Sequence, residues 1–306
     1  MKNKLIATGI VLTLLSFIPN ISLSEIMHNN TEIRYSIYIS GQYKPSVSNF
    51  SNFSVKETNT NTENLVATKQ DIAPLDIDAG LITPKPPQKS QKIYKGLRES
   101  TNFNHPYTAE FQDNNISFGG TIGYSSTKGM RVELEGSYEF FDVKDPIGHK
   151  LHDAHRYFAL ARAMNKHKPF EPKRQYELRT HHTVMRNDGV YISSVMLNGC
   201  YDVSIDELKI SPYMCVGIGI NAIEFFDALH LKLAYQGKLG ISYPMSSNIK
   251  LFADGYYHKV TDNKFKNLKV IHVADLYNIP LVTSAIATLN IEYFGGEIGI
   301  RFGLKL

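Results

Sequence analysis

Apolar and polar side chains alternate residue by residue in several segments of this chain. The clearest segment is 130–140, where one parity is apolar and the other is mostly charged: Met130, Val132, Leu134, Tyr138 and Phe140 against Arg131, Glu133, Glu135 and Glu139. Only a β-strand, whose side chains have period two, separates the two sets onto two faces. An apolar face opposite a charged face is typical of a transmembrane β-barrel, with lipid outside and water or a polar core inside.

Eight segments show this alternation, and each predicts one strand: Ile33–Tyr43, Ile116–Tyr124, Met130–Phe140, Val190–Val203, Pro212–Ile220, Leu231–Tyr243, Ile249–Tyr257 and Ile286–Leu304. In the last segment the apolar parity changes at Gly295-Gly296, which predicts a β-bulge there. An even number of strands is what bacterial outer-membrane barrels have. The fold class that we predict is therefore all-β, an antiparallel transmembrane barrel of eight strands.

The connections between these segments alternate in length. Short ones at 125–129, 204–209 and 244–248 are interleaved with longer ones at about 44–115, 143–189, 221–230 and 260–285. Outer-membrane barrels have short periplasmic turns and long outer loops, so we assign the long segments to the outside. Within the second loop, Asp153–Arg162 has helical spacing and predicts a helix. Phe225 and Phe226, in the third loop, either pack over the barrel mouth or form a contact surface.

The N-terminus has the composition of a secretory signal peptide. Lys2 and Lys4 precede an apolar run from Leu5 to Ile18, and Ser22-Leu23-Ser24 provides small residues for cleavage. We predict a signal peptide at 1–24 and a barrel domain at 25–306. A membrane anchor is the alternative, but a spanning helix needs about 20 apolar residues and this run is shorter.

Composition excludes some classes of protein. A hydrophobic share of 42% with 20% charged residues indicates a folded chain. The net charge of +4 is small and no nucleic-acid motif accompanies it, so we predict no nucleic-acid partner.

Charged residues on the non-lipid face are the main candidates for chemistry. We predict that the following point into the lumen: Arg131, Glu133, Glu135, Glu139, Lys232, Lys238, Lys250 and Asp254. They either pair with one another in a narrow barrel or line a wider pore. A catalytic carboxylate pair is the alternative, but no Ser/His/Asp, phosphate-loop or metalloprotease pattern accompanies it. We therefore expect neither an enzyme nor a cofactor.

His149, His152 and His155 are spaced three apart, which on a helix would bring two imidazoles onto one face. No cysteine and few carboxylates complete a ligand set beside them. We interpret them as solvated surface histidines and predict no metal site.

The two cysteines lie on consecutive predicted strands. If Val203 faces Pro212, then Cys200 is directly opposite Cys215, and both lie on the non-lipid face. Export to an oxidising compartment would allow a disulfide between them. Two unpaired cysteines are the alternative.

Several long blocks of sequence are similar to one known family: Tyr38–Phe50, Asp153–Arg162, Gly199–Val203, Ile210–Cys215, Leu251–His258 and Thr288–Gly296 with Ile298–Phe302. They resemble the major surface protein (surface antigen) family of Anaplasma and Ehrlichia outer membranes. The resemblance implies a surface-exposed, immunodominant outer-membrane barrel, with porin-like passage of small solutes in some members. Two features depart from it: relatives often end on an aromatic residue, whereas Leu306 is last here, and the chain has no Trp.

Two functions compete on this basis. One is a surface antigen with porin-like passive transport of small hydrophilic solutes, and the other is a non-conducting scaffold that displays loops for host-cell adhesion or antibody contact. Eight strands argue against a wide pore, because their interior is about filled by side chains. The expected partners are outer-membrane lipid, host-cell or antibody surfaces and a second copy of the chain. A soluble secreted β-protein with enzymatic activity is a third hypothesis.

Overall fold

The computed structural model of the chain describes residues 35–58, 60–71, 97, 102–126, 128–151, 153–163, 181–204, 209–271 and 284–304. The predicted signal peptide, residues 1–24, lies outside them. Every strand pairing among these residues is antiparallel.

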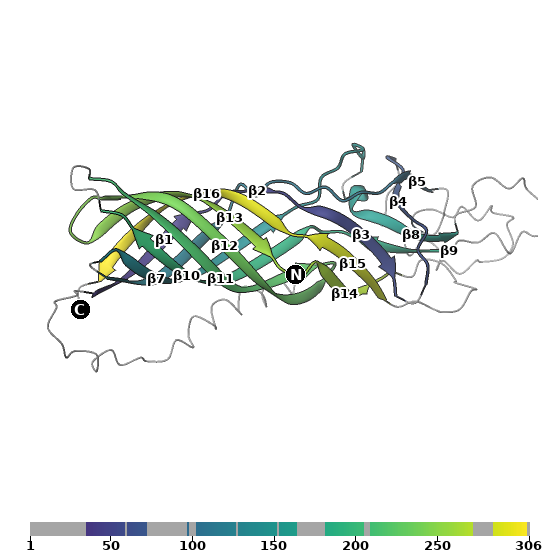
Figure 1. Cartoon of the computed structure of the whole chain (residues 1–306). Coiled ribbons are helices and arrows are strands. Elements are labelled where there is room, and N and C mark those ends of the chain that lie inside the picture. Colours follow the sequence, from purple (N-terminus) through teal and green to yellow (C-terminus); the bar gives the residue numbers. More distant parts are fainter. Residues whose placement is uncertain are drawn as a thin grey trace, which may run out of the picture.

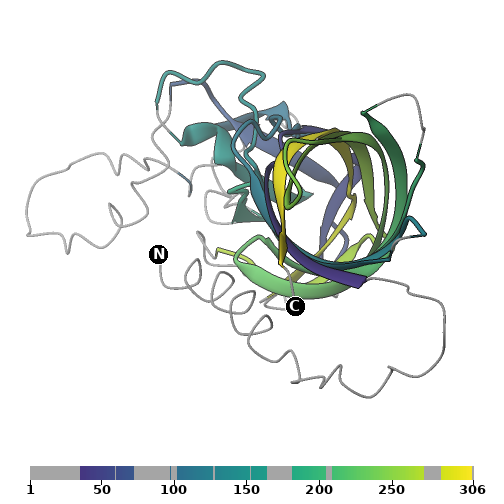
Figure 2. The ribbon, with the colours of Figure 1, turned by 90° about the vertical axis from the view of Figure 1, so that its left-hand side faces the viewer.

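Eight strands form a closed barrel, which confirms the predicted fold class (Figures 1 and 2). In order around the barrel they are β1 (Tyr35–Tyr43), β6 (Phe118–Ser126), β7 (Met130–Phe141), β10 (Val190–Asp202), β11 (Ser211–Phe225), β12 (Ala228–Pro244), β13 (Ile249–Val260) and β16 (Glu292–Leu304). The first and last strands close the ring, since Ile37 to Tyr43 pair with Leu304 to Ile298. Closure leaves no unpaired strand edge inside the membrane.

The barrel has an apolar outside and a polar inside over most of its length. Val216 and Ile218 on β11 and Leu231 on β12 are among the exposed residues, whereas Glu135, Asn198 and Gln236 are buried inside. Strand pleating produces this separation, because alternate residues point to opposite sides of the wall. The exposed apolar side chains form the band that contacts lipid.

Further strands lie beyond the outer end of the barrel, most of them in segments predicted to be loops; β15 belongs mainly to the predicted strand Ile286–Leu304. β2 (Ser46–Ser48) adds to β16, and a three-stranded sheet contains β14 (Lys264–Lys269), β15 (Ser284–Asn290) and β3 (Ser51–Glu57). A four-stranded sheet has the order β5 (Phe103–Pro106), β4 (Asn64–Thr68), β8 (Tyr157–Ala163) and β9 (His181–Arg186). The long outer segments therefore carry their own β-structure (Figure 1).

The helix predicted at Asp153–Arg162 is wrong. A three-residue 3₁₀ turn, η5 (Ala154–Arg156), leads directly into β8. β8 lies between β4 and β9, and Tyr157 to Ala161 are all buried. A strand that is buried on both faces has a continuous apolar run, whose periodicity does not distinguish it from a helix.

No helix among the described residues is long and apolar enough to cross a membrane.

The loop predicted at 221–230 is also wrong. β11 continues to Phe225 and β12 starts at Ala228, so only Phe226 and Asp227 connect them. Both have positive φ, 52° and 56°. This is the backbone that a two-residue type I′ hairpin turn requires.

The bulge predicted at Gly295-Gly296 is wrong as well. β16 pairs with β13 in one unbroken register, from Phe302 opposite Ile249 to Glu292 opposite Lys259. The inward-facing residues keep the same parity throughout: Ala285, Ala287, Leu289, Ile291, Tyr293, Glu297 and Arg301 are all buried. The apolar residues change parity because the surroundings change: Leu289 and Ile291 face an apolar core, whereas Ile298 and Ile300 face lipid.

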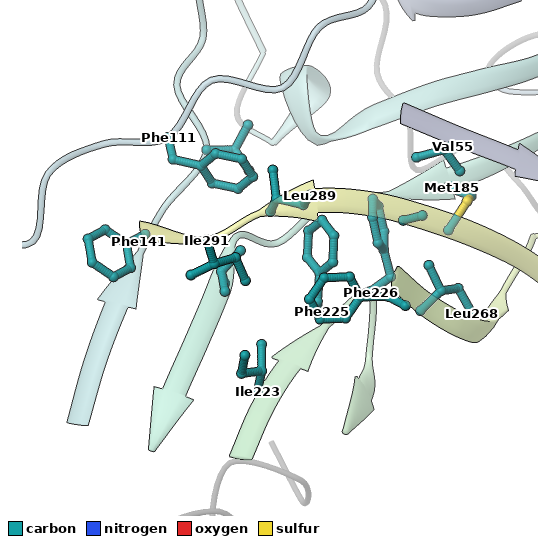
Figure 3. Close-up of a cluster of buried hydrophobic side chains, with 14 of the residues drawn as sticks. Val55, Phe111, Phe141, Met185, Ile223, Phe225, Phe226, Leu268, Leu289 and Ile291 are labelled. Carbon is teal, nitrogen blue, oxygen red and sulfur yellow. The ribbon is translucent and has the colours of Figure 1, made fainter. Parts of the chain in front are cut away.

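That apolar core fills the barrel where it leaves the membrane (Figure 3). Its members come from the outer ends of the barrel strands and from the added sheets: Val55, Phe111, Phe141, Phe158, Met185, Val190, Ile192, Ile223, Phe225, Phe226, Val260, Phe265, Leu268, Leu289, Ile291 and Tyr293, among others. We call this group the outer core.

Candidate functional site in the barrel interior

Glu135 of β7 is the centre of the polar interior. Its Oε1 accepts a hydrogen bond from Lys44 Nζ at 2.7 Å. Its Oε2 accepts from Asn198 Nδ2 at 2.8 Å and from Gln236 Nε2 at 3.0 Å, and Lys238 Nζ lies 2.6 Å away. A fully buried carboxylate needs such a set of donors, because an unpaired charge there costs several kcal/mol.

Two lysines and two glutamates close into a ring of alternating charge, which we call the ionic square. Lys44 Nζ lies 2.7 Å from Glu135 and 2.8 Å from Glu297, while Lys238 Nζ lies 2.6 Å from Glu135 and 2.9 Å from Glu297. The four residues come from β7, β12, β16 and the end of β1. All four are buried. The ionic square therefore links strands on different sides of the barrel across the lumen.

A second polar layer lies nearer the short turns. Arg131 pairs with Glu133 and, through Nε at 2.9 Å, with Asp202 Oδ1. Arg301 lies over the rings of Tyr38 at 5.0 Å and Phe252 at 4.9 Å. Stacked guanidinium groups and aromatic rings occupy much of this part of the lumen.

Asp254 joins this layer through the hydroxyl of Tyr213, which donates to Asp254 Oδ2. A cavity lined by Gln42, Tyr213, Lys238, Glu297 and Arg301, among others, has about 10 Å³ open to the centre of a water molecule. That is space for about one water molecule.

The structure places the predicted lumen residues in different situations. Arg131, Glu133, Glu135, Lys238 and Asp254 belong to the two polar layers. Glu139 is fully buried between the ionic square and the outer core, on the inward face of β7. Lys232 lies at the outer end, where its Nζ pairs with Asp262 Oδ2 at 2.7 Å. Lys250 has the inward parity of β13 but is exposed at the short-turn end.

Sequence reasoning missed several residues of the interior network, among them Lys44, Glu297 and Arg301. Lys44 follows the predicted end of the first strand and was assigned to a loop. Glu297 and Arg301 are single charges among the apolar and glycine residues of β16. Glu297 and Arg301 could have been found from their odd numbers, which they share with the inward-facing Leu289 and Ile291. The predicted bulge at Gly295-Gly296 would have reversed this parity, and so it concealed that they point inward.

Cys200 and Cys215 are opposite each other in the register of β10 and β11, and a disulfide joins them. Both are buried in the lumen beside the second polar layer. Among the described residues, Glu133, Cys200 and Cys215 form the one group whose metal-ligand atoms lie within 4.8 Å of one another. Since the two sulfurs are bonded to each other, this group is not a thiolate metal site.

Among the described residues, His149 and His155 do not belong to a group of three or more side chains whose metal-ligand atoms lie close together. His149 Nδ1 hydrogen-bonds Asp145 Oδ1 at 2.7 Å, and the two imidazole rings are 6.4 Å apart. Burial, and then the neighbouring Arg156 charge, hold the pKa of His155 below its ordinary value. His152 lies outside the described residues.

Outside the membrane, Glu57 of β3 connects the two outer sheets. Its carboxylate accepts hydrogen bonds from Arg162 Nε at 2.7 Å and from Thr183 Oγ1 at 2.6 Å. The hydroxyl of Thr60 donates to it as well. Burial alone would raise the pKa of this carboxyl, but these hydrogen bonds outweigh it and hold the pKa below its ordinary value.

The sequence model of a family described as "Surface antigen" matches residues 29–304. Major surface antigen 4 of Anaplasma marginale is 31% identical over 269 residues, which cover 87% of this chain and 83% of that protein. The chain belongs to the surface antigen family. The resemblance inferred from the sequence blocks is thus confirmed, and this surface antigen is an outer-membrane type of barrel.

Solved barrels are similar at lower identity. The outer membrane protein OprG of Pseudomonas aeruginosa has a TM-score of 0.49 and 13% identity, covering 90% of the surface antigen and 98% of OprG. Neisserial surface protein A has a TM-score of 0.37 and 9% identity, covering 88% and 96% of the two chains.

Proposed function

We propose that this surface antigen is a non-conducting, non-enzymatic barrel that holds its outer sheets at the bacterial surface for contact with host cells or antibodies. The observation that carries the proposal is the double closure of the lumen. The ionic square crosses the middle of the barrel, and the outer core fills its outer end. In this proposal residues 1–24 direct export and are removed.

The ionic square supports this proposal because its four charges satisfy one another. Each charged group of the ionic square has two partners of opposite charge. A pore that selects among solutes needs charges that face water in a continuous path. The cavity beside Lys238, Glu297 and Arg301 has room for about one water molecule.

The outer sheets support the second half of the proposal. The segments that a simple barrel would use as loops are instead paired into two sheets, which pack on the outer core. In this proposal the paired strands of the two sheets provide a rigid scaffold for binding surfaces.

Planar-bilayer recording of the refolded, full-length protein tests the proposal. Folding is verified first by circular dichroism and by the mobility shift on heating. We expect no discrete current steps from folded protein. Steps of uniform size that appear with the native protein and scale with its amount would contradict the closed scaffold and favour porin-like passage of small hydrophilic solutes.

The contact role requires a separate measurement. Antibodies raised against the whole protein should bind intact bacteria through the outer segments, and substitutions in exposed turns of the outer sheets should weaken that binding. Substitutions in the turn at 244–248, at the short-turn end, serve as the control. Antibody binding that depends on the short turns instead would contradict the assigned orientation.

A further inference from the structure

The three-stranded outer sheet has one apolar face and one basic face. Val55, Phe265, Leu268, Ala285 and Ala287 are buried against the outer core. The opposite face carries four exposed lysines and small polar side chains, with Ile286 between them: Ser54, Lys56, Lys264, Lys266, Asn267, Lys269, Ser284 and Thr288. This face, which has no Asp or Glu, is the basic face.

The lysines of the basic face are spread over both edges of the sheet. Lys56 of β3 lies opposite Ile286 of β15 in the antiparallel register. On the other side of β15, Lys264 lies opposite Thr288 and Lys269 opposite Ser284. Since neighbouring strands are about 4.8 Å apart, the four ammonium groups can reach the same patch of surface.

The nearby carboxylates are engaged elsewhere. Glu57 points inward and pairs with Arg162 Nε at 2.7 Å. Asp262 pairs with Lys232 Nζ at 2.7 Å and accepts the backbone N–H of Lys264. Within the described part of the chain, the four lysines of the basic face have no carboxylate at ion-pair distance. The positive charge of this face is therefore left for a partner.

The basic face begins where the lipid-facing band ends. His230 Nε2 hydrogen-bonds the backbone oxygen of Lys266 at 3.0 Å, and Lys232 Nζ donates to that of Lys264 at 2.9 Å. Both side chains come from the inward face of β12. On the outward face of the same stretch, Leu229, Leu231 and Leu233 are 46%, 71% and 65% exposed. β14 thus lies beside the outer end of β12 (Figure 1).

Exposed tyrosines lie on the same wall, nearer the short turns than Leu229, Leu231 and Leu233. Tyr235 of β12 and Tyr257 of β13 are exposed on the outer wall, and Lys259 lies opposite Tyr235 in the register. Exposed tyrosines at the edge of an apolar band are typical of the membrane–water interface. The lysines of β14 lie farther out than these tyrosines, and the contacts with His230 and Lys232 hold Lys264 and Lys266 beside the exposed Leu229 and Leu231, close to the level expected for the lipid headgroups.

The opposite side of the barrel differs. Beyond β7 and β10, the charged residues pair among themselves: Arg156 lies 2.7 Å from Asp142 and 3.7 Å from Asp188. β13 and β7 are separated by four positions around the eight-stranded ring. Arg156, paired with two carboxylates, thus contrasts with the four unpaired lysines of the basic face.

We propose that the basic face binds the phosphate-bearing headgroups of anionic lipids in the outer leaflet, on the β12–β13 side of the barrel. Lysine is suited to this, because its ammonium is a compact charge on a flexible stem that follows mobile phosphates. Positive side chains beside a membrane are attracted to anionic headgroups within a Debye length.

Edge-strand lysines also have a purely protective use, which is to prevent edge-to-edge pairing with another sheet. That role needs positive charge on β14 but makes no distinction between lipids. Lipid selectivity is therefore the property that separates the two roles.

Electron spin resonance with spin-labelled lipids measures this selectivity. The full-length protein is refolded into phosphatidylcholine bilayers that contain a trace of spin-labelled phosphatidylglycerol or spin-labelled phosphatidylcholine. The immobilised fraction of each label gives the relative association of the two lipids with the protein. We expect phosphatidylglycerol to be favoured by about twofold at low salt and the preference to decline at high salt.

The test variant is Lys264→Gln with Lys266→Gln, which leaves the backbone acceptors of β14 in place. The control is Lys69→Gln with Lys150→Gln, which makes the same change in net charge beside β4, farther from the apolar band (Figure 1). We expect the preference to fall close to equality in the test variant and to persist in the control. Heat-modified mobility verifies that both variants fold.

Four results would overturn the proposal. The native protein could show no preference for the anionic label, or the test variant could retain it. The control could lose the preference to the same extent, which would assign it to net charge. A detergent-solubilised sample could bind heparin through Lys264 and Lys266 while lipid selectivity is unchanged, which would make the basic face a polysaccharide site instead.

Discussion

The interior of the barrel has two halves that are built from the same strands. The half within the membrane is lined by polar side chains, and the half beyond the membrane is lined by apolar ones. On β7, Glu135 lies among four polar partners, whereas Phe141 on the same face is part of an apolar cluster. β11 changes in the same way, from Cys215 and Asn221 to Ile223 and Phe225. The outer wall changes in the reverse sense, from exposed Ile218 and Ile220 to Glu224. The same alternate residues point inward along the whole strand, while the surroundings of the outer wall change from lipid to water.

This comparison explains why the lumen is closed twice. Within the membrane, apolar side chains face lipid, so polar groups are left for the interior and have to satisfy one another. Beyond the membrane, polar side chains face water and the interior becomes an ordinary apolar core. Each half should therefore respond to a different kind of substitution.

Glu135→Ala should have the largest effect. It removes the carboxylate that Lys44 and Lys238 share and leaves buried positive charge, at a cost of about 4 kcal/mol in the free energy of unfolding. Urea unfolding in lipid vesicles, followed by circular dichroism, measures it. Ser137→Ala, two residues along the same face, is the control, with an expected loss below about 1 kcal/mol. Equal losses in the two variants would show that the ionic square does not stabilise the barrel.

Phe225→Ala should come next. Phe225 is fully buried in the outer core and contacts Phe226 and Phe265. Truncating it leaves a cavity, which should lower the free energy of unfolding by about 3 kcal/mol. Phe294→Ala on the lipid-facing wall is the control, because it is the same substitution but leaves no cavity inside the protein. It should therefore lower the free energy of unfolding by less. If Phe294→Ala were the more damaging change, the outer core would not be the packed element.

Removal of the Cys200–Cys215 disulfide should have a moderate effect. The bond closes a segment with a sequence separation of 15 between strands that already pair. Cys200→Ser with Cys215→Ser should lower stability by about 2 kcal/mol, below the full loop-closure value because β10 and β11 hold the ends together. Electrophoresis with and without reductant gives a direct check. A native sample that shows no mobility change on reduction, with free thiols that react in denaturant, would contradict the bond.

Glu57 should give the smallest effect, and it depends on pH. Its pKa is depressed in the folded protein, so its stabilisation is fully present above the ordinary carboxyl pKa of about 4.3 and is lost as the pH falls through the folded value. We expect the outer sheets to lose about 1 kcal/mol over that acid range, measured as faster proteolysis of the outer segments. Glu57→Gln should abolish this acid sensitivity. If the Glu57→Gln variant were as acid-sensitive as the native protein, the acid sensitivity would arise from other carboxyl groups.

The sequence was sufficient for the barrel but not for the outer sheets. Lipid on one side and polar groups on the other impose strict alternation, so segments such as Met130–Phe140 are recognisable. β14 reads Lys-Phe-Lys-Asn-Leu-Lys, and a register shift between Phe265 and Leu268 interrupts its alternation. β8 has no alternation because both of its faces are buried. Local pattern carries no signal for such strands, since their pairing is determined by contacts distant in sequence.

The candidate site was partly predictable for the same reason. Glu133 and Glu135 stand out as charges in an alternating strand, but which lysine each one contacts depends on positions across the barrel. Lys44 lies just beyond β1 and reaches Glu135 only because the closed barrel brings β1 and β7 around the same lumen. The change of apolar parity in β16 was interpreted as a bulge, whereas it marks the plane where lipid gives way to water.

A nitroxide scan through residues 286–302 tests that change of environment most directly. Each position is labelled in turn in the bilayer-embedded protein, and collisions with oxygen and with a water-soluble nickel complex are measured. We predict one unbroken period of two. Among the even positions, those that face lipid should be accessible to oxygen: Phe294, Ile298 and Ile300. Those that face water should be accessible to nickel: Ile286 and Thr288. The odd positions Leu289, Ile291 and Glu297 should be shielded from both. A one-residue shift in this period at Gly295-Gly296 would contradict the account.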